Sequence, residues 1–409
     1  MKPAPHPVVW TILYFPFGAL GGFVGVALTF LATRHGLSIG EGATLGAASL
    51  LSQWLKWSWA PIVDVTLTPK RWYVISTVIS ALGVLAMSAL PLSVETLPWM
   101  LVIIASASLV NSIVGMAIEA ILAATTPVEQ QGRVSAWFQA GNLGGNGIGG
   151  GLGLLLLQWL PSPWMAGALL GASFLACTGA LAFVPDIGGH RRIDGVRGAV
   201  RSVWGDLKAL AATKGGVLAA VLCFLPVGTG AAQGVLTQAD VAKYWGASDT
   251  EVALLQGVLA GVVTAAGCFV GGWLSDRMQP RNAYAAIGIG LAAVALGMAV
   301  TPPSVGAYVV WSLTYSLGVG LAYAAFTAVV LNAIGAGSAA TKYNLYASLA
   351  NFPIWWLGLV LAGAAQQWGA PSMLLLEAAL GVVGVVIFAF ATTAVGRTSL
   401  PDVVVEAQG

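Results

Sequence analysis

Two ionisable side chains, Lys56 and Glu119, fall inside long apolar stretches of the chain. Burying a charge in a membrane is costly, so ionisable residues there mark ion pathways, proton relays or charge pairs. Lys56 lies eight residues before Asp64, at the end of its stretch, and Glu119 lies about seven residues before the end of another. At about 1.5 Å per residue, both side chains should lie roughly 10 Å inside the same membrane boundary. We therefore predict that Lys56 and Glu119 form an ion pair.

The role of this pair has two interpretations. In the first, Glu119 takes up and releases a proton, and its charge state is coupled to Lys56, as in a proton relay. In the second, the pair is only structural, or Lys56 extends its long side chain to the lipid headgroups. Asp240, near the end of another apolar stretch, is the third candidate for proton coupling.

Uncharged polar residues form stripes along the same stretches. Ser108, Ser112, Gly115 and Glu119 recur at helical spacing and therefore share one helix face. Such a stripe either lines a solute path or bonds to a neighbouring helix, a contact of only about 0.6–2 kcal/mol in membranes. Aromatic and hydroxyl groups in these stretches suit a large, partly apolar ligand. The candidates for a cavity lining are Tyr14, Ser108, Asn111, Ser112, Gln139, Asn142, Gln233, Thr237, Tyr315, Tyr323, Asn344 and Asn351.

The elements that must position these side chains are membrane-spanning helices. Of 409 residues, 58% are hydrophobic and 8% are charged, against roughly 25% charged in a soluble domain. A span needs about 20 apolar residues, and continuous rather than alternating runs exclude a β-barrel. The predicted fold class is an all-α membrane protein with twelve transmembrane helices. The stretches cover 8–33, 39–62, 73–92, 98–124, 133–159, 164–184, 216–240, 251–274, 282–301, 305–333, 342–367 and 373–396.

The placement of basic residues orients these helices. With both termini in the cytoplasm, fourteen basic residues fall on the inner side and two, Arg34 and Lys243, on the outer side, a strong positive-inside bias. In the longest loop, basic residues alternate at helical spacing with Val200, Val203 and Trp204, which predicts an amphipathic helix on the inner face of the membrane. The inner basic residues are Lys2, Lys70, Arg71, Arg133, the six within 191–214, Arg277, Arg281, Lys342 and Arg397.

The sequence also repeats at an offset of 210 residues. Phe15-Pro16-Phe17-Gly18 corresponds to Leu225-Pro226-Val227-Gly228, and the Ser-x-x-Glu capping box that ends at Glu41 corresponds to the one that ends at Glu251. The repeat predicts an N-terminal six-helix bundle over 1–185, a linker over 186–215 that contains the amphipathic helix, and a C-terminal six-helix bundle over 216–409. The glycines within 141–153 predict close helix packing where the two halves meet.

A loop after the eighth stretch carries a recognisable motif. Gly272-Trp-Leu-Ser-Asp276-Arg277-Met-Gln-Pro-Arg281 resembles the G-x-x-x-D-R-x-x-x-R/K loop of major facilitator transporters. That resemblance implies two six-helix halves with a substrate site between them, reached alternately from either side of the membrane. That the first, fourth, seventh and tenth stretches line a cavity is implied by this resemblance and not by the spacing of the polar residues. It also implies a latch, in which a carboxylate near a helix end pairs with basic residues. The latch residues would be Asp64, Lys70, Arg71, Asp276, Arg277 and Arg281.

Two further segments resemble one branch of that family. Leu55-Lys-Trp-Ser-Trp-Ala-Pro-Ile-Val-Asp64 and Ala347-Ser-Leu-Ala-Asn-Phe-Pro353 are similar to segments of AmpG-type muropeptide permeases, acetyl-CoA transporters and related siderophore importers. The resemblance implies a proton-driven importer of a bulky, often anionic metabolite. We therefore predict a monomeric carrier that moves a medium-sized organic solute across the inner membrane by proton symport. Because few fixed positive charges are visible, a muropeptide, a siderophore or a similar amphipathic metabolite fits better than a polyanion. Asp64 is followed by Val65 and not by the arginine common there, so the first-half latch should be weaker.

Other classes of function fit less well. Net charge +2 leaves no footprint for nucleic acid, and three scattered cysteines make no disulfide framework. The histidines lie in the N-terminus and in loops, so neither a metal site nor a catalytic triad emerges, and we expect no cofactor. An integral membrane enzyme therefore remains the weaker alternative, because its chemistry would need converging catalytic groups. An uncoupled facilitator or an exporter of the same fold stays open as well.

Overall fold

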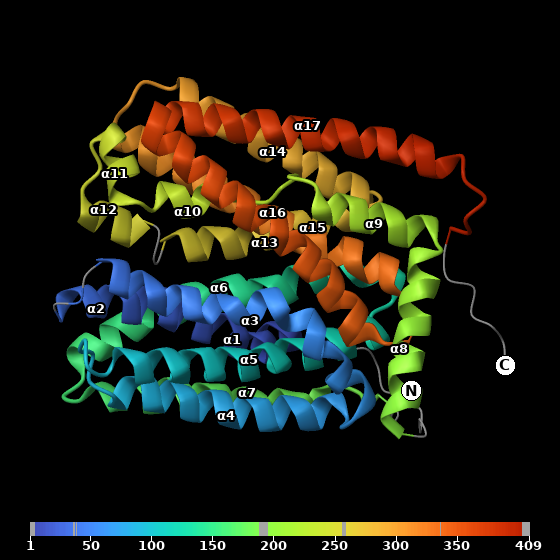
Figure 1. Ribbon diagram of the computed structural model, residues 1–409, viewed down its shortest axis with the longest axis horizontal. Helices are drawn as coiled ribbons and strands as arrows, with labels where there is room; N and C mark the ends of the chain where they lie inside the picture. The colour runs from blue at the N-terminus through green and yellow to red at the C-terminus, as the bar shows by residue number, and fades with distance from the viewer. Residues whose placement is uncertain are drawn as a thin grey trace. The chain divides into compact units, whose positions relative to one another are not determined.

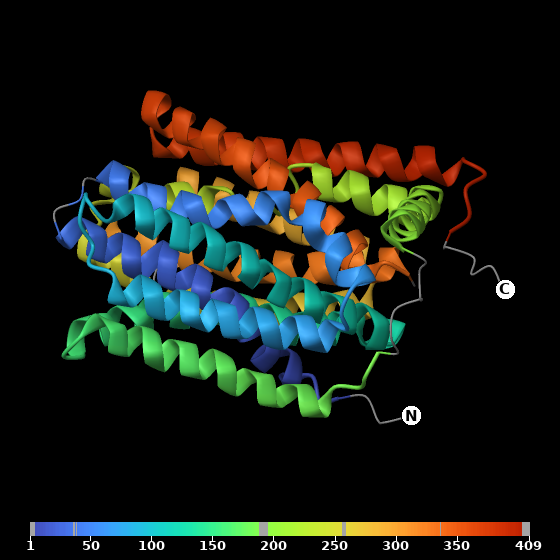
Figure 2. The ribbon, with the colours of Figure 1, turned by 60° about the horizontal axis from the view of Figure 1, so that its bottom comes forward.

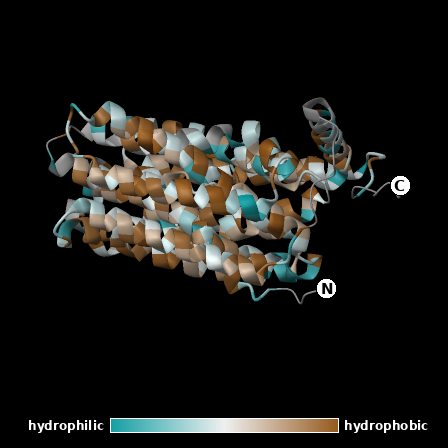
Figure 3. Ribbon diagram, turned by 90° about the horizontal axis from the view of Figure 1, so that it is seen from below, coloured by the Kyte–Doolittle hydropathy of each residue, from teal (hydrophilic) through white to brown (hydrophobic). Residues whose placement is uncertain are grey.

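The computed structural model describes residues 5–35, 37, 39–187, 195–255, 259–335 and 337–402. All regular structure within these ranges is helical, and each of the twelve predicted stretches coincides with one or more helices. Eight helical segments of the described chain, two of them made of consecutive helices, are long and apolar enough to cross a membrane. Hydrophobic residues run along most of the length of the helices, and hydrophilic ones gather mainly near their ends (Figure 3). The predicted all-α membrane fold is confirmed.

The chain divides into two compact units. Unit 1 comprises Met1–Thr125 and Trp137–Val196, and unit 2 comprises Thr126–Ala136 and Arg197–Gly409. These units differ from the predicted domains at two points. The linker helix groups with unit 2, and so does the short segment Thr126–Ala136, which includes the first turns of a helix whose remainder belongs to unit 1.

Unit 1 is built around its first helix and the helices that pack on it. Phe23, Val84, Ile104 and Phe174 come from four different helical segments and lie in one buried apolar cluster. α4 and α7 lie side by side along their length (Figure 1). The helices are α1 (Val8–Gly22), η1 (Phe23–Leu28, a π-helix), α2 (Thr29–Arg34), α3 (Ile39–Val65), α4 (Pro69–Ala89), α5 (Leu97–Thr125), η2 (Val128–Gln130), α6 (Gln131–Trp159), α7 (Pro163–Cys177) and η3 (Thr178–Phe183).

Glycines let α1 and α6 approach until their backbones touch. A Cβ atom at Gly18 would lie 1.9 Å from the Asn142 carbonyl oxygen, and one at Gly149 would lie 2.0 Å from the Ala19 carbonyl oxygen. Small residues allow this approach of membrane helices. The predicted close packing is therefore confirmed for Gly141, Gly145 and Gly149. Their partner is α1, in the same bundle, because a glycine face serves any neighbour whose backbone fits against it.

Unit 2 contains the remaining helices, and α14 and α17 lie side by side within it (Figure 1). The helices are α8 (Gly195–Ala211), α9 (Lys214–Phe224), α10 (Ala232–Leu236), α11 (Ala239–Ala242), η4 (Lys243–Trp245), α12 (Asp249–Leu254), α13 (Ala260–Arg277), α14 (Pro280–Val300), α15 (Val305–Ile334), α16 (Ala339–Trp368) and α17 (Ala370–Gly396).

The linker helix α8 meets α9 at a sharp corner. The axes of the two helices differ by 88° (Figure 2), and the Thr213 side chain accepts a hydrogen bond from Gly216 N–H to start α9. One side of α8 buries Val203 and Leu210, whereas Val200 and Trp204 are exposed. A helix perpendicular to a span, with apolar groups both buried and exposed, suits a position in the plane of the membrane surface. The predicted amphipathic helix is thus present within 186–215.

The seventh predicted span, 216–240, is not one continuous helix. α9 ends at Phe224, and regular helix resumes only at Ala232. Pro226 lacks a backbone N–H, while Gly228 and Gly230 have φ angles of 62° and 67°, a region that favours glycine. The apolar composition of the stretch predicted a span, and the proline within it, Pro226, lies where the helix is interrupted.

Two smaller expectations have clear outcomes. The capping box at Ser248 and Glu251 is present in full at the start of α12, whereas Ser38 of the first-half copy lies outside the described residues. Lys342, expected near the cytoplasmic boundary, is buried in α16 and donates a 3.0 Å hydrogen bond to the Ile334 carbonyl. A lysine there satisfies one of the free carbonyls at the end of α15.

Candidate functional site

The most buried acidic side chain predicted to act is Glu119, on α5 in unit 1. It is 1% exposed, and its Oε1 accepts a 3.0 Å hydrogen bond from the Tyr14 hydroxyl of α1. Tyr14 is itself 3% exposed. A buried carboxylate needs hydrogen-bond donors or an opposite charge, and this tyrosine supplies the first of these requirements.

Lys56, on α3, supplies the second. It is 6% exposed, and the charge of Glu119 acts on it electrostatically. Lys56 and Glu119 are thus both buried and interact electrostatically, and the ion pair itself stays a prediction. Three helices, α1, α3 and α5, thus each contribute one polar side chain to a single buried cluster, which we call the Glu119 cluster (Tyr14, Lys56 and Glu119).

Aromatic rings enclose this cluster. The Tyr14 ring stacks on Phe138 of α6 at 3.7 Å between centroids and on Phe17 at 4.8 Å. On α3, the Trp59 indole N–H donates a 3.0 Å hydrogen bond to Ser112 of α5. These contacts hold the Tyr14 hydroxyl in place and keep the surroundings of the carboxylate apolar, which strengthens electrostatic interactions inside.

Most of the other predicted cavity residues in unit 1 bond within the bundle. The Ser108 hydroxyl donates to Ser49 at 3.1 Å, and the Asn111 amide donates to the Phe17 carbonyl at 3.1 Å. The Asn142 amide donates to Gln139 one turn earlier, at 3.0 Å. Of the two readings of the polar stripes, hydrogen bonding between and along helices therefore describes these residues in this structure.

The predicted cavity residues of unit 2 are more dispersed. The Gln233 amide donates to Ser316 at 3.2 Å, while Asn344 is buried and donates to the Ala340 carbonyl of its own helix. Thr237 is exposed, and Tyr323 and Asn351 are half-buried. Asp240 lies in α11, and its side chain lies outside the described residues. The structure does not bring these residues into one cluster.

The predicted latch residues are placed as follows. The Asp276 carboxylate accepts a 2.8 Å hydrogen bond from Gly132 N–H at the start of α6, and Arg277 lies 4.3 Å from the centre of the Trp273 ring. Lys70 was expected to pair with Asp64, but in the structure it forms an ion pair with Asp186 at 2.8 Å. Arg71 is exposed, and Arg281 is half-buried in the first turn of α14.

The contact at Asp276 should contribute measurably to stability. The first N–H groups of a helix lack partners within the helix, and removing a side chain that satisfies one of them costs about 0.5–2 kcal/mol. We expect Asp276→Ala to lower the thermal unfolding midpoint in detergent. Asp186→Ala, which removes a surface ion pair with a median contribution of about 0–1 kcal/mol, should lower it less. An equal or larger loss in Asp186→Ala would contradict this assignment.

Sequence reasoning missed one buried acid, Glu377 of α17. It is 9% exposed, and its Oε1 accepts hydrogen bonds from the Tyr315 hydroxyl and from Ala232 N–H. It stands near the start of a strongly apolar run, so the rule that singled out Lys56 and Glu119 would have found it too. Tyr315, predicted to line a cavity, instead positions this carboxylate.

Comparison with known proteins identifies a family match and several similar solved structures. The sequence profile of the Major Facilitator Superfamily matches residues 10–354, and no curated protein matches the chain. The solved structure of the Escherichia coli fucose:proton symporter is similar, with a TM-score of 0.69 and 17% identity over 94% of this chain and 98% of that chain. A human organic anion transporter (0.67, 16% identity, 95% and 100% covered) and a bacterial homologue of the iron transporter ferroportin (0.63, 16%, 96% and 99%) are similar as well.

At these identities the solved structures establish the fold alone, whereas the profile spans most of the chain. The family match and the apolar helices together indicate a multi-pass membrane transporter rather than an enzyme. The chain belongs to the Major Facilitator Superfamily.

Proposed function

We propose that this protein is a proton-coupled symporter that carries a medium-sized organic solute across the inner membrane by alternating access. The observation that carries the proposal is the Glu119 cluster. A carboxylate that is 1% exposed, bonded to a tyrosine hydroxyl and attracted by a lysine, is the kind of intramembrane acid that proton relays use.

Protonation of Glu119 would change the interactions between the helices of the cluster. As a carboxylate, Glu119 accepts the Tyr14 hydrogen bond and attracts Lys56, so α1, α3 and α5 are held together. Protonation removes the charge, and the attraction to Lys56 is lost. Proton binding therefore changes the free energy with which these three helices associate, and a conformational change requires such a differential interaction.

For the substrate, the branch resemblance is the guide. The segments ending at Asp64 and Pro353 are similar to those of muropeptide permeases and siderophore importers, and we propose an amphipathic metabolite of that size. The fucose:proton symporter with the same fold is itself proton-coupled, which supports the coupling but not the substrate. The proposal includes cytoplasmic termini, a monomeric state and a latch at Asp276 that orders the start of α6.

Transport in proteoliposomes tests the coupling. A thermal-shift screen with a muropeptide, a siderophore and acetyl-CoA first selects the solute that binds the purified protein. We expect the wild type to concentrate that solute when a proton gradient is imposed. Glu119→Gln should lose uphill uptake and its pH dependence but retain counterflow, because a glutamine can still accept the Tyr14 hydrogen bond and cannot carry a proton.

The control for that experiment is Glu95→Gln, since Glu95 is an exposed acid between α4 and α5 and should leave transport unchanged. Uphill, pH-dependent uptake that survives in Glu119→Gln would contradict the proposal. A wild type that shows counterflow and no response to the gradient would identify the uncoupled facilitator instead.

A further inference from the structure

Unit 2 contains an interruption of helical structure deep in its bundle. Between α9 and α10, residues 225–231 turn through Gly228 and Gly230, whose φ angles are positive. The backbone bonds of this described segment are few: Leu225 N–H donates to the Val221 carbonyl at its start, Val227 N–H donates to the Leu225 carbonyl, and the Gly230 carbonyl accepts from Gln233 N–H at its far end. The regular helical ladder is therefore absent, and carbonyl oxygens become available to a ligand.

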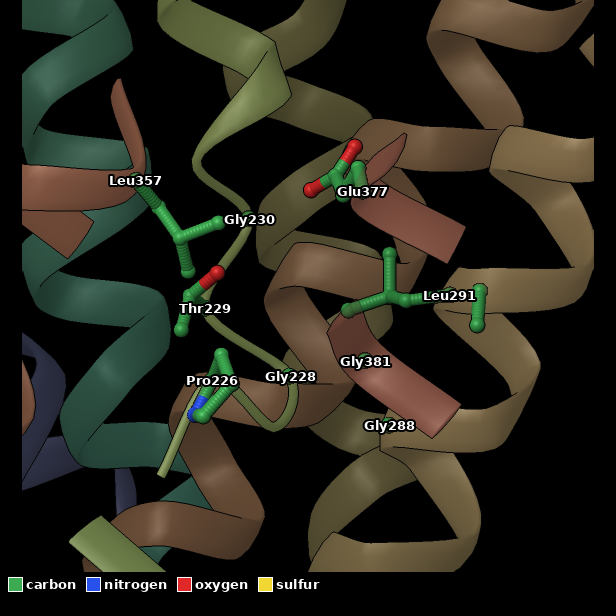
Figure 4. A pocket seen from close by; sticks show the side chains of 10 residues that line it. Pro226, Gly228, Thr229, Gly230, Gly288, Leu291, Leu357, Glu377 and Gly381 are labelled. Atoms are coloured by element: carbon green, nitrogen blue, oxygen red, sulfur yellow. The ribbon is translucent and has the colours of Figure 1, made fainter. Parts of the chain in front are cut away.

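Glu377 of α17 faces this break. Its Oε1 accepts hydrogen bonds from Tyr315 O–H and Ala232 N–H, but its Oε2 is buried and has no hydrogen-bond partner. Figure 4 shows the carboxylate above the segment that carries Thr229 and Gly230, with the Thr229 hydroxyl oxygen directed toward the same region. A buried acceptor without a partner costs free energy unless something satisfies it.

A small pocket lies between these groups. Its volume is about 10 Å³, roughly the space of one water molecule, so an organic solute cannot fit. Gly288 and Leu291 of α14, Leu357 of α16 and Thr229 complete its wall. Of the residues that line it, Glu377 alone is titratable, and Tyr315 of α15 is the titratable group bonded to it. No basic side chain lines the pocket to balance the carboxylate.

We propose that Glu377 and the α9–α10 break bind one small monovalent cation, a proton or Na⁺. The carboxylate Oε2, the Thr229 hydroxyl and the carbonyl oxygens of the break are hard oxygen ligands, which small hard cations prefer. Unwound helix segments with exposed carbonyls coordinate coupling ions in other transporter folds. Binding itself does not depend on the proposed function. Only the suggestion that this cation takes part in coupling rests on it.

Infrared difference spectroscopy of the full chain in detergent tests the site. One series varies pH from about 5 to 9 in choline chloride, and the second replaces choline by Na⁺ at fixed pH. If the cation is a proton, a neutral carboxyl band should appear as pH falls, should ignore Na⁺, and should be lost in Glu377→Gln. If it is Na⁺, the carboxylate band should shift with Na⁺ in the wild type and not in Glu377→Gln.

Further variants separate the outcomes. Tyr315→Phe removes one hydrogen bond and should shift the Glu377 band, which assigns it even if Glu377→Gln does not fold. Thr229→Val should weaken Na⁺ binding about tenfold or more, as the loss of a group at a metal site does, and should leave a proton band nearly unchanged. Glu95→Gln is the exposed control.

Identical spectra for the wild type and Glu377→Gln in both series would overturn the proposal, as would a band that ignores pH, Na⁺ and Tyr315→Phe alike. Glu119→Gln should keep the Glu377 signal. A failure of uphill transport in Glu119→Gln and a failure of cation binding at Glu377 are therefore distinguishable.

Discussion

Lys56→Met should destabilise the protein by about 3–5 kcal/mol, the cost of breaking a buried charge pair by removing one partner. Methionine keeps most of the length of the lysine side chain, so the change removes charge rather than volume. Glu119 would then remain buried at 1% exposure and would still accept the hydrogen bond from the Tyr14 hydroxyl. The loss of stability in Lys56→Met should become smaller as pH falls. Protonation of Glu119 then removes the negative charge that Lys56 no longer balances.

A double variant tests whether the destabilisation comes from the unbalanced charge of Glu119. Glu119→Gln in the Lys56→Met background removes both charges together, and replacing a whole buried pair is often neutral or stabilising. We therefore expect Lys56→Met/Glu119→Gln to unfold at a higher temperature in detergent than Lys56→Met alone. If the two single effects simply add, the interaction energy is zero, and the pair does not hold α3 to α5.

Gly22→Ala should lower the stability of unit 1 strongly, because the added methyl group has no room. A Cβ atom at Gly22 would lie 1.8 Å from the Asn146 carbonyl oxygen. This atom belongs to the backbone, so it cannot move aside as the end of a flexible side chain could. Overpacking typically costs about 1–3 kcal/mol and occasionally more, and we expect the upper part of that range. Helix α1 would have to move away from α6, and the Tyr14 ring would lose its stacking on Phe138.

Gly46→Ala is the matched control, since nothing lies within 4 Å of a Cβ atom at that position of α3. An alanine there should be neutral or stabilising by about 0.5–1 kcal/mol, because glycine is unfavourable in a helix interior. Thermal unfolding followed by tryptophan fluorescence measures both variants. Equal midpoints for Gly22→Ala and Gly46→Ala would show that α1 and α6 are not in the close contact described.

The sequence was sufficient to predict the spans and to single out two ionisable side chains, Lys56 and Glu119, that are buried within them. Composition and run length predict helices where the structure has them, because lipid leaves few alternatives for the backbone. The electrostatic interaction of Lys56 with Glu119 could be predicted from depth, since the two residues lie at similar distances along their helices from the same membrane face. The hydrogen bond from Tyr14 was not, because it joins residues 105 positions apart, and spacing carries no information on which helices are neighbours.

The internal repeat misled in one respect. Pro16-Phe17-Gly18 and Pro226-Val227-Gly228 are equivalent in sequence, yet α1 continues through Pro16 to Gly22, whereas α9 ends before Pro226. Two features accompany this difference. Gly18 of α1 is packed against the Asn142 backbone, whereas the second-half segment has a further glycine with positive φ, Gly230. Repeated sequence thus predicts topology better than local conformation, because only one of the two equivalent prolines lies at a helix break.

The bond between Asp276 and Gly132 has a consequence for the synthesis of the chain. The two residues are 144 positions apart, so at about 5–20 residues per second roughly 7–30 s of translation separate them. During that interval the first turn of α6 has emerged from the ribosome while its acceptor does not yet exist. Water or lipid headgroups must serve its free N–H groups meanwhile. The start of α6 is therefore completed only when a much later part of the polypeptide has been made.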